Sequence, residues 1–217
     1  MRIPNHIGII PDGNRRWAVN MGFTKEKGYD YGLKPGIDMF KLCQQVGVKE
    51  VTYYGFTTDN TKRPSSQTEA FTKACIDAVE MLVHEDASLL VVGNTNSPKF
   101  PEKLKPYTTR QDFGKGGLRV NFLVNYGWHW DLENLYLNGG KGNRSKKNIM
   151  DSIYTSDISR VDLIIRWGGR RRLSGFLPVQ SIYSDFYVID DLWPDFDDEH
   201  FYGALEWYNN QDITLGG

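Results

Sequence analysis

The sequence has few residues of the kinds that stabilise secreted domains, hold structural metals or cross membranes. Its 217 residues include two cysteines and four histidines, and neither type has the spacing of a zinc site or a disulfide framework. No apolar run reaches the roughly 18 residues of a membrane span, and the N-terminus has no signal-peptide hydrophobic region. We therefore expect a soluble, cytoplasmic protein whose thiols, Cys43 and Cys75, stay reduced in the core.

No charge of one sign dominates either. The chain carries 26 lysines and arginines against 27 aspartates and glutamates, a formal net charge of −1, so its overall field points to neither nucleic acid nor an acidic membrane. The nucleophile elbow, the CxxC pair, the Walker loop and the dinucleotide-binding glycine motif are all missing. Aromatic residues, by contrast, make up 13% of the chain, which suits either a core or the lining of an apolar pocket.

Short apolar runs alternate with helical patterns along the chain. Strands are predicted at residues 7–10, 51–56, 88–93, 118–125, 161–165 and 186–189, and helices at 34–46, 66–84, 99–109 and 195–210. This alternation is typical of an α/β fold with a mostly parallel sheet flanked by helices. The chain has no repeat, linker or shift in composition, so we predict a single domain over residues 1–217 with a six-stranded sheet.

The opening stretch, residues 6–17, joins a buried strand to a helix through a sharp turn. Pro11 ends the strand, residues 12–14 (Asp-Gly-Asn) make the turn, and Arg15 and Arg16 begin the helix. Such a turn presents free backbone N–H groups to an anion, and the Asp12 carboxylate is a ligand that Mg²⁺ accepts beside phosphate oxygens. The alternative interpretation is a turn aspartate, an asparagine cap and two solvated arginines.

A second cationic stretch follows the predicted strand 161–165. Four arginines lie within residues 166–172, around a Gly-Gly pair, in a chain without excess positive charge. A charge run is usually a solvated surface, but arginine forks suit diphosphate, and ligands of parallel sheets bind at the carboxyl ends of the strands. We therefore expect a set of polar residues to lie together at the carboxyl edge of the sheet. They are Asp12, Asn14, Arg15, Arg16, Asn60, Arg63, Arg166, Arg170, Arg171, Arg172 and Ser174.

An acidic stretch at residues 190–199 also offers paired aspartates. Paired aspartates on one helix face can bridge Mg²⁺ to diphosphate, but Pro194 argues against a continuous helix here. We expect Asp195, Asp197 and Asp198 to cap and charge the start of the last helix instead.

Together these motifs resemble those of the cis-prenyltransferases, the family of undecaprenyl diphosphate synthase. The resemblance extends from His6 to the last predicted helix, with the motifs in order and correctly spaced. It rests on the segments Asp12-Gly-Asn-Arg-Arg-Trp-Ala18, Tyr54-Gly-Phe-Thr-Thr-Asp-Asn60 with Arg63-Pro64, Asn125-Tyr-Gly127, Asp162-Leu-Ile-Ile-Arg166 with the following Gly-Gly and Arg172-Leu-Ser174, and Leu192-Trp-Pro-Asp-Phe196.

The resemblance implies a homodimer with a hydrophobic tunnel in each subunit. It also implies an Mg²⁺-dependent condensation of an allylic diphosphate with isopentenyl diphosphate, short-to-medium products, and contact with a membrane surface through the lipid product. Asp12 matches the family's magnesium aspartate, Asn60 an asparagine with a catalytic role, and Asp185 stands where the family has a metal-binding glutamate. The substrate-binding residues implied are Gly13, Asn14, Arg15, Arg16, Trp17, Lys25, Tyr29, Thr57, Thr58, Asp59, Arg63, Arg166, Arg172, Leu173 and Ser174.

The sequence departs from the family mainly around the acceptor and metal sites. Arg170 and Arg171 replace the usual Glu and His, Trp167 replaces a small Thr, and the tail at residues 211–217 lacks the usual arginines. We expect Trp167 to add bulk beside the acceptor's five-carbon chain. Three functions are open: ordinary elongation with isopentenyl diphosphate, irregular coupling of two allylic diphosphates such as dimethylallyl diphosphate, and a non-catalytic partner subunit. The intact donor motif disfavours the last.

Overall fold

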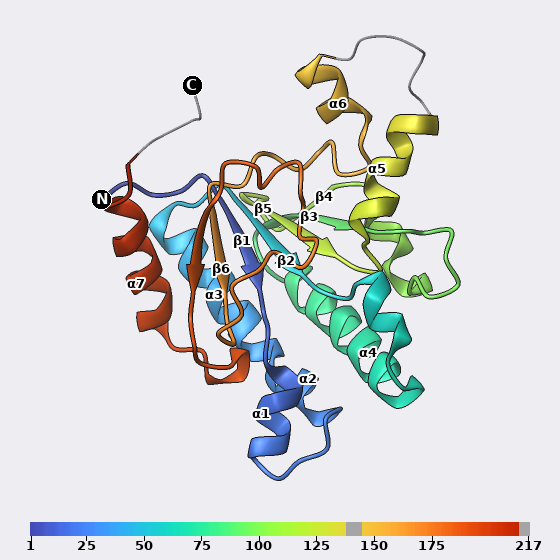
Figure 1. Cartoon of the computed structure of the whole chain (residues 1–217), viewed down its shortest axis with the longest axis vertical. Helices are drawn as coiled ribbons and strands as arrows, with labels where there is room; N and C mark the ends of the chain where they lie inside the picture. Colours follow the sequence, from blue (N-terminus) through green and yellow to red (C-terminus); the bar gives the residue numbers. More distant parts are fainter. Residues whose placement is uncertain (138–144, 213–217) are drawn as a thin grey trace.

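The chain folds around one twisted sheet (Figure 1). The computed structural model describes residues 1–137 and 145–212. All neighbouring strands are parallel except the β3–β4 pair, which is antiparallel. In the spatial order β4-β3-β5-β2-β1-β6-β7, the strands are β1 (His6–Ile10), β2 (Glu50–Tyr54), β3 (Ala87–Val92), β4 (Gln111–Phe113), β5 (Leu118–Leu123), β6 (Leu163–Arg166) and β7 (Asp185–Val188).

The α/β fold with a mostly parallel sheet is confirmed, but the predicted six strands are wrong, because the sheet has seven. The missed strand, β4, is a three-residue edge strand that is largely exposed. Three residues are too few to show a period-two apolar pattern. The predicted helix at 99–109 is also shorter than expected: it is the 3₁₀ helix η2 (Glu102–Thr108), in which Pro106 lacks a backbone N–H.

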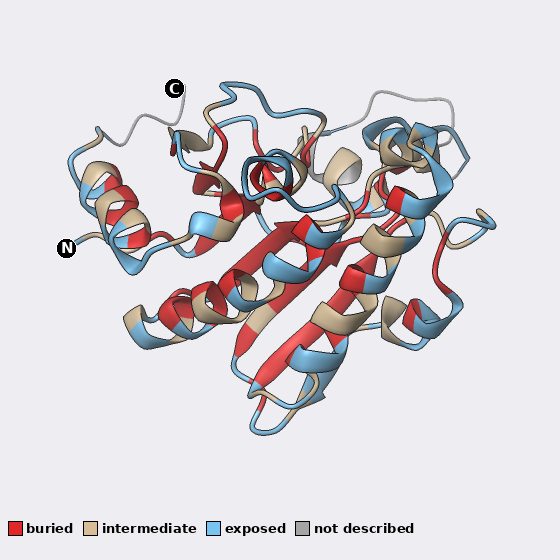
Figure 2. Ribbon diagram, turned by 90° about the horizontal axis from the view of Figure 1, so that it is seen from below, coloured by how far each residue is buried: buried red, intermediate tan, exposed pale blue. Residues whose placement is uncertain are grey.

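The helices surround a sheet whose strands are mostly buried, as Figure 2 shows in red. On one face, apolar side chains of α3, α4 and α7 pack against alternate strand residues such as Val120 and Phe122. On the other face, Leu123 packs with Phe176 and Leu177 from a long irregular segment. The helices are α1 (Asn14–Asn20), α2 (Lys27–Tyr31), α3 (Leu33–Val46), η1 (Thr58–Lys62), α4 (Ser65–Leu82), α5 (Trp128–Leu137), α6 (Lys146–Ser152), η3 (Trp193–Asp195) and α7 (Asp198–Asn209).

The register of the sheet places three loops at one edge. Ile10, at the end of β1, pairs with Arg166 at the end of β6, and Ile9 pairs with Tyr53 near the end of β2. The loops that follow β1, β2 and β6 therefore leave the sheet side by side, at the carboxyl ends of the strands. This edge is where parallel sheets bind ligands.

Two sequence-based expectations concern residues outside those described. The arginine-free tail extends over residues 211–217, of which 213–217 are not described, and the single-domain prediction for residues 1–217 includes them and residues 138–144. Within residues 1–137 and 145–212, no helix combines the length and apolar character needed to span a membrane.

Candidate active site

A polar cleft of about 830 Å³ lies at the carboxyl edge of the sheet. It brings together residues from the loops after β1, β2 and β6, as the strand register requires. Most of the predicted binding residues line it, and so does Arg170: the lining includes Asp12, Gly13, Asn14, Arg15, Arg16, Lys25, Tyr29, Thr57, Asp59, Asn60, Arg63, Arg166, Arg170, Arg172 and Ser174.

Asp12, in the loop after β1, contacts one arginine of α1 and one arginine at the end of β6. Its Oδ2 accepts a hydrogen bond of 2.7 Å from Arg166 Nη2, and its Oδ1 lies 3.4 Å from Arg16 Nη2. Arg16 Nη2 also donates to the carbonyl oxygen of Gly168 at 2.9 Å. A Cβ atom on Gly168 would lie 2.3 Å from that nitrogen, so only glycine permits this approach. Residues 11–16, here called the donor loop, and residues 166–174, here called the arginine loop, are thus in direct contact.

Arg166 is the most buried of the cleft's cations, with only 3% of the residue exposed. Its Nη1 donates to the backbone oxygen of Arg172 and, at 2.9 Å, to Ser174 Oγ. The Tyr54 hydroxyl donates to the Ser174 carbonyl at 2.8 Å, and burial raises the pKa of Tyr54, so this donor keeps its proton. Within the described part of the chain, Arg166 Nε is buried without a hydrogen-bond partner, and a ligand oxygen would satisfy it.

The loop after β2 holds Asn60 in a compact turn. Thr57 N donates to Asn60 Oδ1 at 3.0 Å, and Asn60 N donates to the Thr57 carbonyl at 2.9 Å. The bond from Thr57 N to the Asn60 side chain is one half of the capping box of η1, and the Thr57 side chain faces Asn60 N in the other half. The side-chain oxygen of Asn60 is used in the turn, which leaves the amide NH₂ as the group offered to a ligand in the cleft.

Side chains of α4 and α2 fix two further arginines. Arg15 Nη1 donates to Gln67 Oε1 at 3.0 Å, and Arg63 Nη1 donates to the Tyr29 hydroxyl at 3.0 Å. Tyr29 stacks on Phe71 with ring centroids 4.6 Å apart. Burial raises the pKa of the Tyr29 hydroxyl and lowers the pKa of Arg63, but both groups keep their protons at neutral pH. The two arginines are therefore preorganised for an anion.

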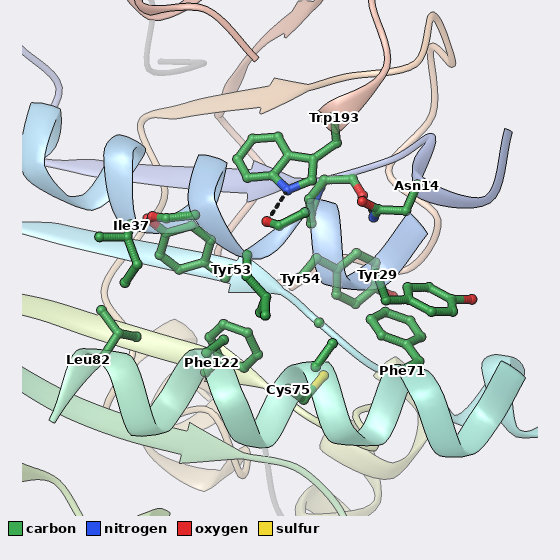
Figure 3. Close-up of a pocket in the computed structure, with 17 residues that line it drawn as sticks. Asn14, Tyr29, Ile37, Tyr53, Tyr54, Phe71, Cys75, Leu82, Phe122 and Trp193 are labelled. Carbon is green, nitrogen blue, oxygen red and sulfur yellow. Dashed lines mark hydrogen bonds between the residues drawn. The ribbon is translucent and has the colours of Figure 1, made fainter. Parts of the chain in front are cut away.

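An apolar cavity of about 70 Å³ opens from the same wall, between α3 and α4 (Figure 3). It lies over the end of β2, and small side chains of α4 leave the space. The residues that line both this cavity and the cleft are Pro11, Asn14, Tyr29, Tyr54, Gly55 and Phe71. The residues that line the cavity alone are Gly32, Leu33, Gly36, Ile37, Tyr53, Ala74, Cys75, Ala78, Leu82, Phe122 and Trp193.

Five residues expected at the site or at the carboxyl edge of the sheet do not line the cleft. Arg171, expected at that edge, is exposed and lies outside the cleft lining. Trp17 is buried, and its Nε1 donates to Asp195 Oδ1 at 2.6 Å. Thr58 uses its backbone N–H on the Tyr126 carbonyl, and Leu173 is a surface residue. Asp185 begins β7.

The position of Asp185 separates it from Asp12 within one chain. Asp185 pairs with Leu163, the first residue of β6, whereas Ile10 pairs with Arg166, the last. Asp185 therefore lies at the amino edge of the sheet, and Asp12 follows the carboxyl edge. The structure does not bring the two predicted metal ligands together.

The structure also corrects the expectation for Trp167. Its side chain is completely buried, in edge-on contact with Trp193 at 4.7 Å between ring centroids. It packs in the helix-covered core, on the opposite face from the adjacent Arg166 side chain. Trp167 therefore adds no bulk to the cleft.

Two residues beside the cleft were not predicted from the sequence. Gln67, which accepts a hydrogen bond from Arg15, and Phe71, which lines the cleft, lie on α4, for which the sequence predicted only a helix. One signal was present: Ala74, Cys75 and Ala78 are small residues on the stripe that faces the sheet. Small side chains on a buried stripe leave room for a ligand.

The chain is similar to a known family and to known proteins along nearly its whole length. The family model described as "Putative undecaprenyl diphosphate synthase" matches residues 10–216. The ditrans,polycis-undecaprenyl-diphosphate synthase ((2E,6E)-farnesyl-diphosphate specific) of Yersinia pseudotuberculosis is 32% identical over 100% of this chain and 91% of that protein. Its counterpart in Escherichia coli K12 is 31% identical, covering 98% of this chain and 89% of that one. An isoprenyl transferase of Thermus thermophilus is 31% identical over 99% and 89%.

A solved structure shares the fold. The lavandulyl diphosphate synthase of Lavandula x intermedia, crystallised with dimethylallyl diphosphate, superposes with a TM-score of 0.86. The likeness covers 99% of this chain and 98% of that one, at 23% sequence identity. The match to the family model over residues 10–216 and the relatives at 31–32% identity show that the chain belongs to the undecaprenyl diphosphate synthase family of prenyltransferases.

Proposed function

We propose that this chain is an isoprenyl diphosphate synthase that condenses an allylic diphosphate with isopentenyl diphosphate. One observation carries the proposal: arginines from different loops line a single cleft in which Arg16 and Arg166 both contact the Asp12 carboxylate, and an apolar cavity opens from the wall of that cleft. Two cationic groups suit two diphosphates, and an apolar cavity suits a prenyl tail.

The donor side consists of Asn14, Arg15, Arg16 and Arg63. These residues hold the allylic diphosphate, and its tail enters the apolar cavity past Tyr29 and Phe71. When the allylic C–O bond breaks, the electron pair leaves with the diphosphate, and fixed arginines stabilise that developing charge. The helix α1 has only seven residues, so the arginines rather than its dipole supply most of the field.

The acceptor side consists of Arg166, Arg172 and Ser174. Two observations support the binding of a second diphosphate here: Arg166 Nε has no hydrogen-bond partner among the described residues, and the Tyr54 hydroxyl fixes the backbone of Ser174. The new carbon–carbon bond joins the donor's allylic carbon to the acceptor's terminal carbon, and the acceptor loses a proton. Asn60 also lines the cleft, and we propose that its amide NH₂ orients a substrate by hydrogen bonding.

The donor set of the cleft fits Mg²⁺ shared with substrate. Among residues 1–137 and 145–212, no three His, Cys, Asp or Glu side chains cluster as a protein-only metal site, and Asp12 and Asp59 are the carboxylates in the cleft lining. Mg²⁺ commonly binds through one or two carboxylates and completes its shell with phosphates and water. We propose that Asp12 holds Mg²⁺, which would neutralise charge on the departing diphosphate, and we leave Asp185 out of this site.

The small size of the cavity supports short-to-medium products. Its volume is about 70 Å³, less than half that of the cavity of about 150 Å³ that binds one benzene molecule. Even a tail of one isoprene unit therefore requires the walls to move, and each further unit requires a larger movement, so short tails are favoured.

Changing the cavity volume is expected to change the preferred donor. Ala78→Leu fills the cavity and should reduce kcat/KM for geranyl diphosphate relative to dimethylallyl diphosphate by about tenfold, and Leu82→Ala should shift the ratio the other way, because a methylene changes discrimination by about 10–200-fold. Steady-state kinetics with both donors measure this. Val79→Ala is the matched control, since Val79 is a buried α4 residue outside the cavity lining. An unchanged ratio in both variants would contradict the assignment of the tail site.

Arg172→Ala is expected to weaken acceptor binding selectively. A charged hydrogen bond contributes about 1.5–3 kcal/mol, so the acceptor KM should rise roughly 10- to 150-fold, while the donor KM changes much less. Arg171→Ala is the control, because Arg171 is an exposed neighbour that does not line the cleft. Equal losses for both substrates would show that the two sites are wrongly assigned.

A second candidate function is irregular coupling of two allylic diphosphates. The observation in its favour is Arg170, which lines the cleft at a position where the family usually has an acid. An extra cation beside Arg166 and Arg172 favours a second diphosphate without a second carboxylate-bound metal. A non-catalytic partner subunit is the least supported candidate, because the donor residues are complete.

One assay separates these functions. The purified chain, with Mg²⁺, is incubated with labelled dimethylallyl diphosphate, with and without isopentenyl diphosphate, and the products are identified. Head-to-tail products that need isopentenyl diphosphate support elongation, and a product from dimethylallyl diphosphate alone supports irregular coupling. The assay is repeated with the longer allylic donors up to geranylgeranyl diphosphate, and no turnover with any of them would refute the proposed enzyme.

The family resemblance also leads us to propose a homodimer and a cytoplasmic location. The two buried thiols, Cys43 and Cys75, suit a reducing compartment, and membrane contact would be limited to release of the lipid product. Gel filtration with light scattering tests the dimer: the expected mass is twice the 24.9 kDa of one chain, and a single-chain mass would contradict it.

A further inference from the structure

Residues 189–196, here called the bridging segment, lie behind the cleft and contact both of its cationic loops. Toward the arginine loop, Gly169 N donates to the Ile189 carbonyl at 3.0 Å, and Gly168 N donates to the Asp191 carbonyl at 2.7 Å. These bonds fix the Gly-Gly turn from which Arg170 and Arg172 project. The bridging segment contains the paired aspartates of the sequence, yet its contacts with this loop are made by backbone atoms.

The same segment holds the donor loop. Trp193 N donates to the Asp12 carbonyl at 3.0 Å, and Leu192 packs under Gly13 so closely that a Cβ there would lie 2.9 Å from its side chain. Trp193 Nε1 donates to the Gly32 carbonyl at 2.9 Å, the bond drawn as a dashed line in Figure 3. Backbone and side-chain contacts thus join the segment to the start of α1 and to the start of α3.

One side-chain hydrogen bond joins the segment to the body of α1. Trp17 Nε1 donates to Asp195 Oδ1 at 2.6 Å, although the two residues are 178 positions apart. Trp17 is buried against Phe23 and Tyr31, so its ring has a fixed position. Asp195 lies in η3, directly after Trp193 and Pro194. This bond sets where α1, and hence Arg15 and Arg16, lies relative to the bridging segment.

We propose that the bridging segment sets the distance between the donor and acceptor diphosphates, and that Trp17 and Asp195 are positioning residues for the transfer step. The proposal rests on the proposed function, because it needs two substrates that react with each other. Transfer between two bound molecules is sensitive to their separation, and a displacement of about 1 Å can cost about 100-fold in rate. Binding of each diphosphate by its own arginines is much less sensitive to that separation.

The kinetic test compares three variants. Asp195→Ala and Trp17→Phe are expected to lower kcat by about 10- to 100-fold, with the KM of each substrate within about threefold of the wild type. Asp195→Asn keeps the oxygen acceptor and should retain most of the wild-type kcat. The matched control is Asp197→Ala, which removes the α7 cap on Glu199 N and touches neither loop. The proposal fails if Asp195→Ala lowers kcat no more than Asp197→Ala, or if KM rises and kcat does not change.

A measurement without turnover keeps the proposal testable if the proposed function is wrong. Hydrogen–deuterium exchange is followed in peptides covering residues 12–17 and 166–172, in the full-length chain without ligand. Asp195→Ala should speed exchange in both peptides by at least about threefold relative to Asp197→Ala. The reason is that loss of the Trp17–Asp195 bond lowers the free energy of local opening of both loops. Faster exchange in neither peptide, or only near residue 195, would overturn the proposal. If the wild-type chain shows no turnover but the exchange pattern is as expected, the proposed function is refuted and the positioning role of the bridging segment is not.

Discussion

Asp12→Asn is expected to lower kcat by at least about 1,000-fold, a loss of about 4 kcal/mol in transition-state stabilisation. The amide keeps the shape of the side chain but not the negative charge that Mg²⁺ needs. In the described cleft the other carboxylate is Asp59, which is exposed and pairs with Lys62 at 2.8 Å. Asp59 is not positioned to replace Asp12 as a magnesium ligand, because its side chain points to solvent from η1 and is not held by the arginines of the described cleft.

The choice of asparagine matters for this experiment. Asp12→Ala would leave the buried Arg166 guanidinium without its 2.7 Å partner, and removing one partner of a buried ion pair commonly costs about 3–5 kcal/mol of stability. Asp59→Asn is the control and should keep kcat within about threefold. If Asp12→Asn kept more than about a tenth of the wild-type kcat, Asp12 would not be the magnesium carboxylate.

Trp167→Thr is expected to lower the free energy of unfolding by about 3–5 kcal/mol, the usual cost of removing a buried tryptophan. The ring is completely buried and contacts Trp193 and Phe196, and its Nε1 lies 3.4 Å from His200 Nδ1. Threonine would leave a cavity and a hydroxyl there. Urea unfolding measures the loss.

This result would also separate stability from acceptor choice. The folded fraction of Trp167→Thr should give the same ratio of products as the wild type, since the ring does not line the cleft. Trp128→Thr is the matched control, because Trp128 is half exposed and its loss should cost less than about 1 kcal/mol. A changed product ratio with unchanged stability would place Trp167 functionally in the acceptor site after all.

The order of strands and helices, and the rim at the carboxyl ends, could be predicted because the local patterns agree with the fold. Residues 6–17 combine an apolar run, a proline stop and a glycine turn, and each of these indicates the same structure. The edge strand β4 could not be predicted, because its three residues gain their pairing from β3 rather than from their own pattern.

The errors at the site have different physical reasons. Neighbouring residues at a strand end point to opposite faces, so an Arg166 side chain in the cleft already implied that Trp167 points into the core. Asp185 was predicted just before a strand, which places it at the amino edge of a parallel sheet. The Trp17–Asp195 bond could not be predicted at all, since it joins residues 178 positions apart.

We propose that the cleft holds the donor diphosphate at α1, with its tail in the apolar cavity. A crystal structure of the chain with Mg²⁺ and dimethylallyl thiolodiphosphate, an uncleaved analogue of the donor, tests this most directly. We expect the diphosphate among Asn14, Arg15, Arg16 and Arg63, Mg²⁺ on Asp12, and the tail between α3 and α4 near Phe71. A diphosphate bound at Arg166 and Arg172 with its tail outside the cavity, and none at α1, would contradict the account.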